Sequence, residues 1–156
     1  MGLLTPVAIR LGALEWLPRF LPQITRADRT LSRLSRGRVT LVRIAGLPSL
    51  ELTVAGRKSG IPRTTPVLCV PYGEGFLVAG SNFGGPTVPV WVFNVRDAAT
   101  VQIAVGGKSM TAVPRELTGD EREAAWKHML KTWPNYAKYA ERADRTIPVF
   151  LMEPTI

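Results

Sequence analysis

The residues best suited to chemistry in this chain form a short cationic run that follows a segment of alternating apolar and polar residues. The run reads Gly56-Arg57-Lys58-Ser59-Gly60-Ile61-Pro62-Arg63-Thr64-Thr65-Pro66. Arginine offers a forked set of donors and lysine a compact charge, and glycine lets backbone approach a ligand closely. Without an anion between them, the three cations would mostly repel each other. We interpret residues 56–63, the basic turn, as a site for a phosphate-bearing ligand.

The spacing within the basic turn does not fit two common phosphate-binding motifs. A P-loop needs Gly-x-x-x-x-Gly-Lys-Ser/Thr, and a dinucleotide-binding turn needs Gly-x-Gly-x-x-Gly; the run follows neither order. An ATPase or a Rossmann-type enzyme is therefore not indicated. The alternative to a ligand site is a solvated basic hairpin turn, because exposed arginine and lysine are common on protein surfaces.

Other reactive residue types do not form a catalytic set in the sequence. The single cysteine, Cys69, and the single histidine, His128, give little support for a disulfide, a metal centre or a Ser-His-Asp triad. No carboxylate pair is predicted on a shared face. We expect no metal, and we expect any enzymatic activity to depend on a bound cofactor that the protein holds and orients.

The basic character of the chain is concentrated at its start. The net charge is +8 over 156 residues, and residues 1–45 contribute eight arginines and two acidic residues. Between Thr25 and Gly37, apolar residues and arginines fall on opposite sides of a predicted helix, and such a helix suits an anionic membrane surface. The alternative is that its apolar stripe packs on the rest of the protein. We treat residues 1–45 as an N-terminal helical arm.

The same segment bears on localisation and on macromolecular partners. No secretory signal or membrane span is recognisable. We therefore expect a cytoplasmic protein, and the candidate place for peripheral membrane association is the inner face of the cell membrane. The basic stretch lacks the interleaved aromatic residues with which single-strand binders stack bases. We therefore expect no nucleic-acid partner.

Helical patterns occur in the arm and again near the C-terminus. Thr5 and Pro6 predict the start of a first helix with Val7 and Leu11 on its apolar face. Capping boxes at Thr25 and at Thr118 predict two further helices. Pro134 breaks the helix that begins at Thr118 and can start another. A short helix is also expected around residues 90–95.

Alternating and turn-forming residues between these helices predict short strands. They cover Leu50–Val54, about Thr64–Val70, Phe76–Ala79, Val101–Val105, Lys108–Arg115 and Ile147–Met152. Pro66 cannot donate to a ladder, so its strand is expected at an edge or a bulge. Short strands joined by tight turns favour a barrel over a doubly wound sheet. The sequence predicts an α+β fold in which residues 46–156 form a mostly antiparallel barrel of about six strands.

Three further motifs follow the basic turn in order. They are Leu77-Val78-Ala79-Gly80-Ser81-Asn82-Phe83-Gly84-Gly85-Pro86, Pro89-Val90-Trp91-Val92-Phe93-Asn94, and Trp133-Pro134-Asn135-Tyr136-Ala137-Lys138-Tyr139 with Arg145-Thr146-Ile147-Pro148-Val149. Together the motifs resemble the deazaflavin-dependent nitroreductase family, over about Leu50 to Pro154. The resemblance implies a split β-barrel that binds reduced coenzyme F420 and reduces quinones, nitro compounds or activated enones.

The resemblance also implies roles for individual residues. The phosphate end of F420 would be held by the basic turn, and the ring would be lined by residues 65–67 and Ser81, with Asn82 standing where some relatives carry lysine. The implied cofactor-binding set is Arg57, Lys58, Ser59, Gly60, Arg63, Thr65, Pro66, Val67, Ser81, Asn82, Gly84, Gly85, Trp91 and Asn94. For Trp91 and Asn94, a structural role in the core is the alternative.

The implied catalytic set is Tyr136, Tyr139, Ser81 and Trp133. The three aromatic residues are spaced to lie along one helical face and could roof the ring and a planar substrate, with Tyr136, or else Ser81, orienting or protonating the acceptor. The alternative is that they pack into the core.

We therefore predict an F420-dependent oxidoreductase that passes a hydride to a planar, electron-poor acceptor such as a quinone. One alternative is a related barrel that binds FMN or haem, with FMN as the alternative cofactor. Another is a carrier that binds the deazaflavin without turnover. A monomer or weak oligomer is expected.

Overall fold

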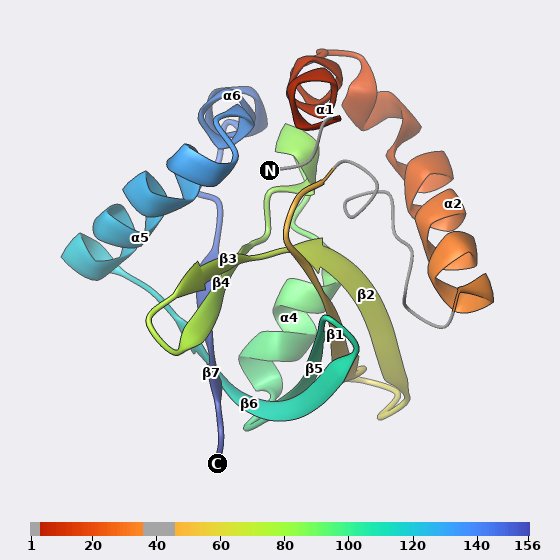
Figure 1. The fold of residues 1–156 in the computed structure, drawn as a ribbon, viewed down its shortest axis with the longest axis vertical. Coiled ribbons are helices and arrows are strands. Elements are labelled where there is room, and N and C mark those ends of the chain that lie inside the picture. The colour runs from red at the N-terminus through yellow and green to blue at the C-terminus, as the bar shows by residue number, and fades with distance from the viewer. Residues whose placement is uncertain (1–3, 36–45) are drawn as a thin grey trace.

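The computed structural model describes residues 4–35 and 46–156, which form a curled antiparallel sheet with helices on its outside and one helix within its curl (Figure 1). The strands are β1 (Ser49–Ala55), β2 (Pro62–Leu68), β3 (Val70–Tyr72), β4 (Gly75–Ala79), β5 (Val101–Val105), β6 (Lys108–Glu116) and β7 (Val149–Pro154). The α-helices are α1 (Thr5–Gly12), α2 (Leu21–Leu34), α4 (Val90–Asp97), α5 (Gly119–Thr132) and α6 (Asn135–Ala143), and the 3-10 helices are η1 (Leu17–Phe20) and η2 (Asn82–Gly84).

The sheet has seven strands in the order β2-β1-β5-β6-β7-β4-β3. The extra strand arises because the segment predicted as one strand from Thr64 to Val70 divides at Cys69 into β2 and β3. These two strands are the opposite edges of the sheet, although one residue separates them in the chain. The sheet therefore curls into a split barrel, as predicted, and Pro66 lies in an edge strand, where it costs no ladder bond.

Two apolar cores lie on the two faces of this sheet. Leu50, Leu52 and Val54 alternate along β1 into the first core, where they meet Trp91 and Val92 of α4 inside the curl. The second core lies between the outer face and the C-terminal helices α5 and α6. It contains the aromatic residues at 133, 136 and 139. Helix α4 and helix α6 thus sit on opposite sides of the sheet.

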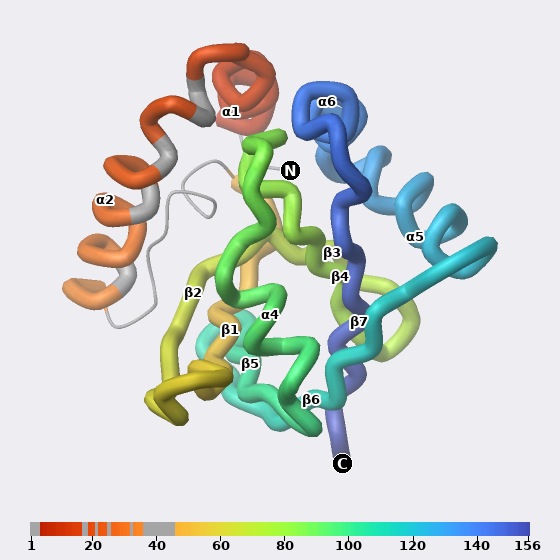
Figure 2. Tube along the Cα trace, turned by 180° about the vertical axis from the view of Figure 1, so that it is seen from behind, coloured from red at the N-terminus to blue at the C-terminus, as the bar shows by residue number. Residues whose placement is uncertain are grey.

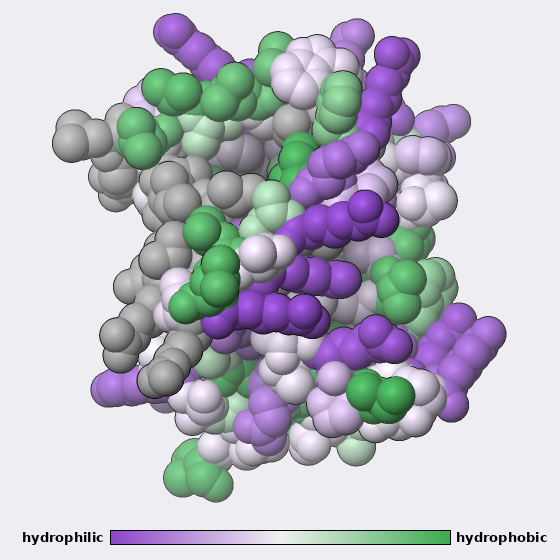
Figure 3. Space-filling view, turned by 90° about the vertical axis from the view of Figure 1, so that its right-hand side faces the viewer, coloured by the Kyte–Doolittle hydropathy of each residue, from purple (hydrophilic) through white to green (hydrophobic). Residues whose placement is uncertain are grey.

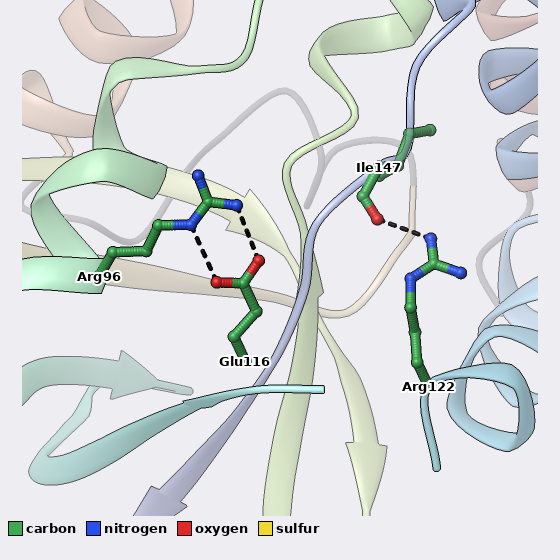
Figure 4. A network of polar contacts seen from close by, with 4 residues as sticks. All are labelled: Arg96, Glu116, Arg122 and Ile147. Atoms are coloured by element: carbon green, nitrogen blue, oxygen red, sulfur yellow. Dashed lines mark hydrogen bonds and ion pairs between the residues drawn. The ribbon is translucent and has the colours of Figure 1, made fainter. Parts of the chain in front are cut away.

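Two polar contacts join helices to the sheet side of the molecule (Figure 4). Arg96 of α4 makes a bidentate ion pair with Glu116 of β6, with Nη2 2.7 Å and Nε 2.9 Å from the carboxylate oxygens. Arg122 of α5 donates from Nη2 to the carbonyl oxygen of Ile147 at 2.7 Å, just before β7. Helix α5 begins at the predicted place, although the Thr118 side chain makes no capping hydrogen bond.

Helix α1 packs on α6 through a face that the sequence did not predict. Val7 and Leu11, the expected apolar face, are each 53% exposed, whereas Thr5 and Gly12 are buried. A Cβ on Gly12 would lie 2.8 Å from the Trp133 ring, so the helix seats closely on the aromatic residues. The expected face is wrong because only a small residue allows this approach.

Helix α2 begins at Leu21, so residue 25 lies inside it and the predicted capping box is wrong. The helix ends at Leu34, and the predicted stop at Gly37 lies outside the described residues. Ile24 and Leu31 are half-buried, and the arginines at 26, 29 and 33 are exposed. The helix lies beside β2 (Figure 1). Within residues 4–35 and 46–156, every helix is too short or too polar to cross a bilayer.

Candidate cofactor site

The basic turn is closed by hydrogen bonds of its own backbone. Gly56 N donates to the Ile61 carbonyl at 2.9 Å, and Gly60 N donates to the Gly56 carbonyl at 2.7 Å. Gly60 has a φ of 69°, and a Cβ on Gly56 would lie 2.6 Å from the Ser59 hydroxyl oxygen. Gly60 is therefore favoured by its positive φ, and a Cβ at Gly56 would require the Ser59 side chain to move. This compact backbone leaves the side chains at 57–59 exposed to solvent.

Helix α4 anchors the basic turn. The buried amide oxygen of Asn94 accepts a hydrogen bond from Arg57 N at 3.0 Å, and the Arg57 guanidinium lies 5.1 Å from the centroid of the Phe93 ring. Trp91 is buried in the first core and its ring lies 6.0 Å from that of Phe150. The structure thus gives Asn94 and Trp91 supporting positions, and their contact with a cofactor stays a prediction.

The cations of the basic turn have no acidic partner in the part of the chain that the structure describes. Its four ion pairs all involve other residues, and Arg57, Lys58 and Arg63 are exposed. Like charges held close together without a counter-ion attract an anion from solution. The donor set therefore fits a phosphate or a carboxylate better than it fits an internal structural role.

Edge strand β2 leads away from the basic turn and carries the predicted ring-lining residues. Arg63 lies at its start, Thr65 and Pro66 are half-buried, and Val67 is buried. Four residues of strand span about 13 Å, so Arg63 and Val67 lie well apart along the strand. In Figure 1, β2 rises from the basic turn at the lower right toward the middle of the molecule. This arrangement suits an elongated ligand with an anionic end.

The predicted loop around Ser81, here called the glycine loop and defined as residues 80–87, lies between α1 and α6 (Figure 2). Asn82, Phe83 and Gly84 all have positive φ, at 48°, 52° and 78°. A Cβ on Gly84 would lie 2.9 Å from Cα of Tyr139 in α6. The Asn82 amide donates to the Thr87 carbonyl at 3.1 Å, within the loop itself.

The remaining predicted residues of this loop are only partly covered. Ser81 is half-buried, and Gly85 is buried beside it. The loop lies near the top of Figure 1 and the basic turn near the bottom, so the two parts of the predicted site are well separated. Strand β2 lies between them in that view. A ligand that contacts both must therefore extend along the molecule.

The three aromatic residues predicted to roof the ring lie in the second core. Trp133, Tyr136 and Tyr139 are 5%, 3% and 1% exposed. Phe83 of the glycine loop packs edge-on against Tyr139, with centroids 6.0 Å apart. Burial raises the pKa of Tyr136 above its usual value, and burial raises the pKa of Tyr139 to about 12. In this conformation Tyr139 packs against the loop, and the contact of all three aromatic residues with an acceptor stays a prediction.

Sequence reasoning missed three residues that hold this region together. Phe93 lies under the Arg57 guanidinium, Arg142 donates to the Phe83 carbonyl at 3.2 Å, and Arg145 reaches the glycine loop. Arg142 lies outside the motifs that carried the family resemblance, and Phe93 lies within one of them without an assigned role, because each contacts a segment distant in the chain. Arg145 lies within a motif that carried the family resemblance, which was a signal without an assigned role.

A family model described as F420H(2)-dependent quinone reductase matches residues 24–154. The chain belongs to this family. It is 32% identical to an F420H(2)-dependent quinone reductase of Mycobacterium tuberculosis (strain ATCC 25618 / H37Rv) over 88% of this chain and 95% of that protein. The resemblance inferred from the four motifs is thereby confirmed. The family's description names quinones as the substrates, and the reduction of nitro compounds stays a prediction.

Two solved structures extend the comparison to the fold. One, described as an F420-H2 dependent reductase (FDR-A), is 38% identical, with a TM-score of 0.63 over 68% of this chain and 94% of that chain. The other, described as a domain-swapped dimer, is 35% identical, with a TM-score of 0.65 over 82% of this chain and 94% of that chain. In both cases the matched region covers almost the whole of the solved chain, which supports one shared split-barrel architecture.

Proposed function

We propose that this chain is an F420-dependent reductase of quinones. The observation that carries the proposal is the basic turn, whose three exposed cations lack acidic partners in the described chain and lie at one end of an edge strand. In a member of this family, the fitting ligand is the anionic tail of F420. Its deazaflavin ring would then lie farther along β2, toward the glycine loop.

The residues that would hold the cofactor fall into three groups. Arg57, Lys58 and Arg63 supply charge and donors for the phosphate and the acidic tail. The half-buried residues Thr65 and Pro66 offer an edge for the ring, because β2 pairs with β1 on one side only. When bound, reduced F420 would supply a hydride to a planar, electron-poor acceptor. The contribution of the chain is to bind, orient and exclude water, which lowers a barrier when the reactants are held close together.

The hydroxyl groups near the glycine loop are candidates for orienting the acceptor. Tyr136 carries its proton at neutral pH, as any tyrosine does, and burial raises its pKa further. It is only 3% exposed, however. Ser81 is half-buried in the glycine loop, where a ligand reaches it more readily. We therefore favour Ser81 as the group that contacts the acceptor, with Tyr136 acting only if the packing that buries it in the second core rearranges.

Anaerobic mixing of the protein with reduced F420 and menadione tests the proposal. We expect oxidation of the deazaflavin that requires both protein and quinone. Tight F420 binding without oxidation across a panel of quinones, enones and nitro compounds would instead indicate a carrier. Failure to bind F420, together with a yellow or red colour of the purified protein, would indicate FMN or haem and would refute the proposal.

We also propose that the arm binds an anionic membrane surface. Leu4, Val7, Leu11, Trp16 and Phe20 are between 48% and 53% exposed. Figure 3, which faces the α2 side, shows hydrophilic side chains crossing that face and hydrophobic ones gathered toward its upper part. Exposed apolar residues beside arginines are typical of helices that lie in the headgroup region. Co-sedimentation with anionic vesicles at low salt tests this, and its absence would count against it.

The oligomeric state of this chain stays a prediction of a monomer or weak oligomer. The relative described as a domain-swapped dimer supports a test for a dimer as well. Light scattering across a range of protein concentrations measures the mass directly. A mass of two chains that persists on dilution would overturn the expected monomer or weak oligomer.

A further inference from the structure

The guanidinium of Arg145 is bound to the backbone of the glycine loop. Arg145 follows α6 by two residues and precedes β7. Its Nη2 lies 3.2 Å from the Gly80 carbonyl oxygen, 3.2 Å from that of Ser81 and 3.1 Å from that of Thr87. Its Nε donates to the Gly85 carbonyl at 3.3 Å. One side chain thus joins both ends of the loop that carries Ser81.

Arg145 makes none of the ion pairs found among the described residues. Its Nη1 is buried without a hydrogen-bond partner, and burial lowers the pKa of the side chain. Arg145 is half-buried, and burying part of a guanidinium without a carboxylate costs free energy unless other groups accept its hydrogen bonds. The four loop carbonyls are its recorded partners, so the glycine loop is the segment that this arginine serves.

The glycine loop needs such an external support. Asn82 and Phe83 have φ values of 48° and 52°, which residues with a side chain rarely adopt. The loop contributes the Asn82 side-chain bond to the Thr87 carbonyl, and α6 contributes the Arg142 bond to the Phe83 carbonyl. Strained conformations persist when surrounding contacts over-determine them. Among the described side chains outside the loop, Arg145 makes four hydrogen bonds to it and Arg142 makes one.

Arginine is suited to this arrangement in a way that lysine is not. Its planar fork holds five donors in fixed directions, whereas lysine carries a single nitrogen. Contacts from Nε to Gly85 and from Nη2 to the other three carbonyls come from two nitrogens of the fork. A lysine at this position would keep the charge and lose the two-nitrogen span.

We propose that Arg145 is a positioning residue that fixes the glycine loop in the conformation that receives the deazaflavin ring. The part of this inference that concerns the ring rests on the proposed function. The part that concerns the loop rests on the contacts of Arg145 alone. Arg145 is not placed in contact with cofactor or substrate, and it acts through the loop backbone.

Arg145→Lys and Arg145→Gln test this proposal, with Arg122→Lys as the matched control. Arg122 also donates to a backbone carbonyl in the α6–β7 connection, that of Ile147, but it does not touch the loop. Amide hydrogen exchange of residues 80–87 is measured first, in protein without ligand. Binding of oxidised F420 is then titrated by fluorescence, and KM and kcat are measured with reduced F420 and menadione.

We expect Arg145→Lys to speed exchange in residues 80–87 at least tenfold and to raise the F420 dissociation constant at least fivefold. KM for reduced F420 should rise while kcat at saturation stays within threefold. Arg122→Lys should leave exchange in the loop and F420 binding unchanged. If Arg145→Gln does not fold, the lysine variant carries the test.

Unchanged loop exchange in Arg145→Lys would overturn the proposal. So would equal effects of the Arg122→Lys control, because general destabilisation would then explain both. Faster exchange with unchanged F420 binding would overturn the link between loop and cofactor. If the wild-type protein does not bind F420, the proposed function fails, and the exchange measurement still decides whether Arg145 holds the loop.

Discussion

Replacing both Lys58 and Arg63 by alanine is expected to weaken F420 binding at least tenfold. The change removes two of the three cations of the basic turn, while its backbone hydrogen bonds and the Asn94 anchor on Arg57 stay in place. Because both side chains point to solvent, we expect the turn to keep its shape. The loss should therefore fall on the affinity and not on the stability of the protein.

The magnitude follows from the exposure of the two cations. An exposed ion pair contributes about 0.2–1 kcal/mol, whereas a hydrogen bond to a charged group contributes about 1.5–3 kcal/mol. A value of about 0.7 kcal/mol for each contact, within the range for exposed ion pairs, gives about 1.4 kcal/mol for the two contacts together. This corresponds to a tenfold change in the dissociation constant. A forked contact between Arg63 and the phosphate would increase the loss.

Fluorescence titration of F420 at two salt concentrations measures the effect. The matched control is Lys127→Ala with Lys131→Ala, which removes the same charge from exposed positions of α5 on the outer side of the sheet. The loss in the test variant should shrink at high salt because ions screen exposed charges. A wild-type dissociation constant in the test variant, or an equal loss in the control, would refute the phosphate assignment.

Three further predictions concern the support of the site. Gly84→Ala should lower the free energy of unfolding in urea by about 2–4 kcal/mol, because the added Cβ combines a positive φ with a close contact to Tyr139. The control Gly73→Ala also has a positive φ but places nothing within 4 Å of the added Cβ, so it should cost about 1–2 kcal/mol. Equal losses would contradict that. Asn94→Ala should cost about 1–3 kcal/mol by leaving Arg57 N without its acceptor, and F420 affinity should fall with it; unchanged stability would argue against the anchor. Burial raises the pKa of Tyr139 from 10.0 to about 12, so between these pH values the folded state keeps a proton that the unfolded state loses. The free energy of unfolding should therefore fall as pH rises through this window, and it should fall less steeply in Tyr139→Phe. The same pH dependence in both proteins would contradict the assignment.

Much of the barrel was readable from local patterns. The alternation of Leu50, Leu52 and Val54 predicted β1, and Gly106-Gly107 predicted the β5–β6 hairpin, where both residues have positive φ. These signals are local, because strand period and turn chemistry act between near neighbours. The division of one predicted strand at Cys69 was not readable, since it depends on the sheet curling back on itself.

The face of α1 was predicted wrongly for a related reason. Counting apolar residues favoured Val7 and Leu11, which are exposed, over the small residue Gly12, which allows close approach to the Trp133 ring. A stripe of apolar residues along a helix identifies its buried face only when the surface against which the helix packs has room for large side chains. Here the partner surface is already filled by aromatic residues.

The candidate site was predicted in its charges but not in its supports. The basic turn and the glycine loop carry signals in composition, whereas the bond from Arg57 to Asn94 and the contacts of Arg145 join segments far apart in the chain. The aromatic residues showed helical spacing that fitted either a lid or a core. Only their burial in the second core distinguishes these alternatives in the described conformation.

A crystal structure with F420 bound measures the central claim most directly. We expect the phosphate within hydrogen-bond distance of Lys58 or Arg63 and the ring beside residues 65–67 and Ser81. The Arg57 backbone should remain bound to Asn94, since the basic turn is formed before the ligand arrives. A cofactor whose tail lies away from the basic turn, with those cations in open solvent, would contradict the account.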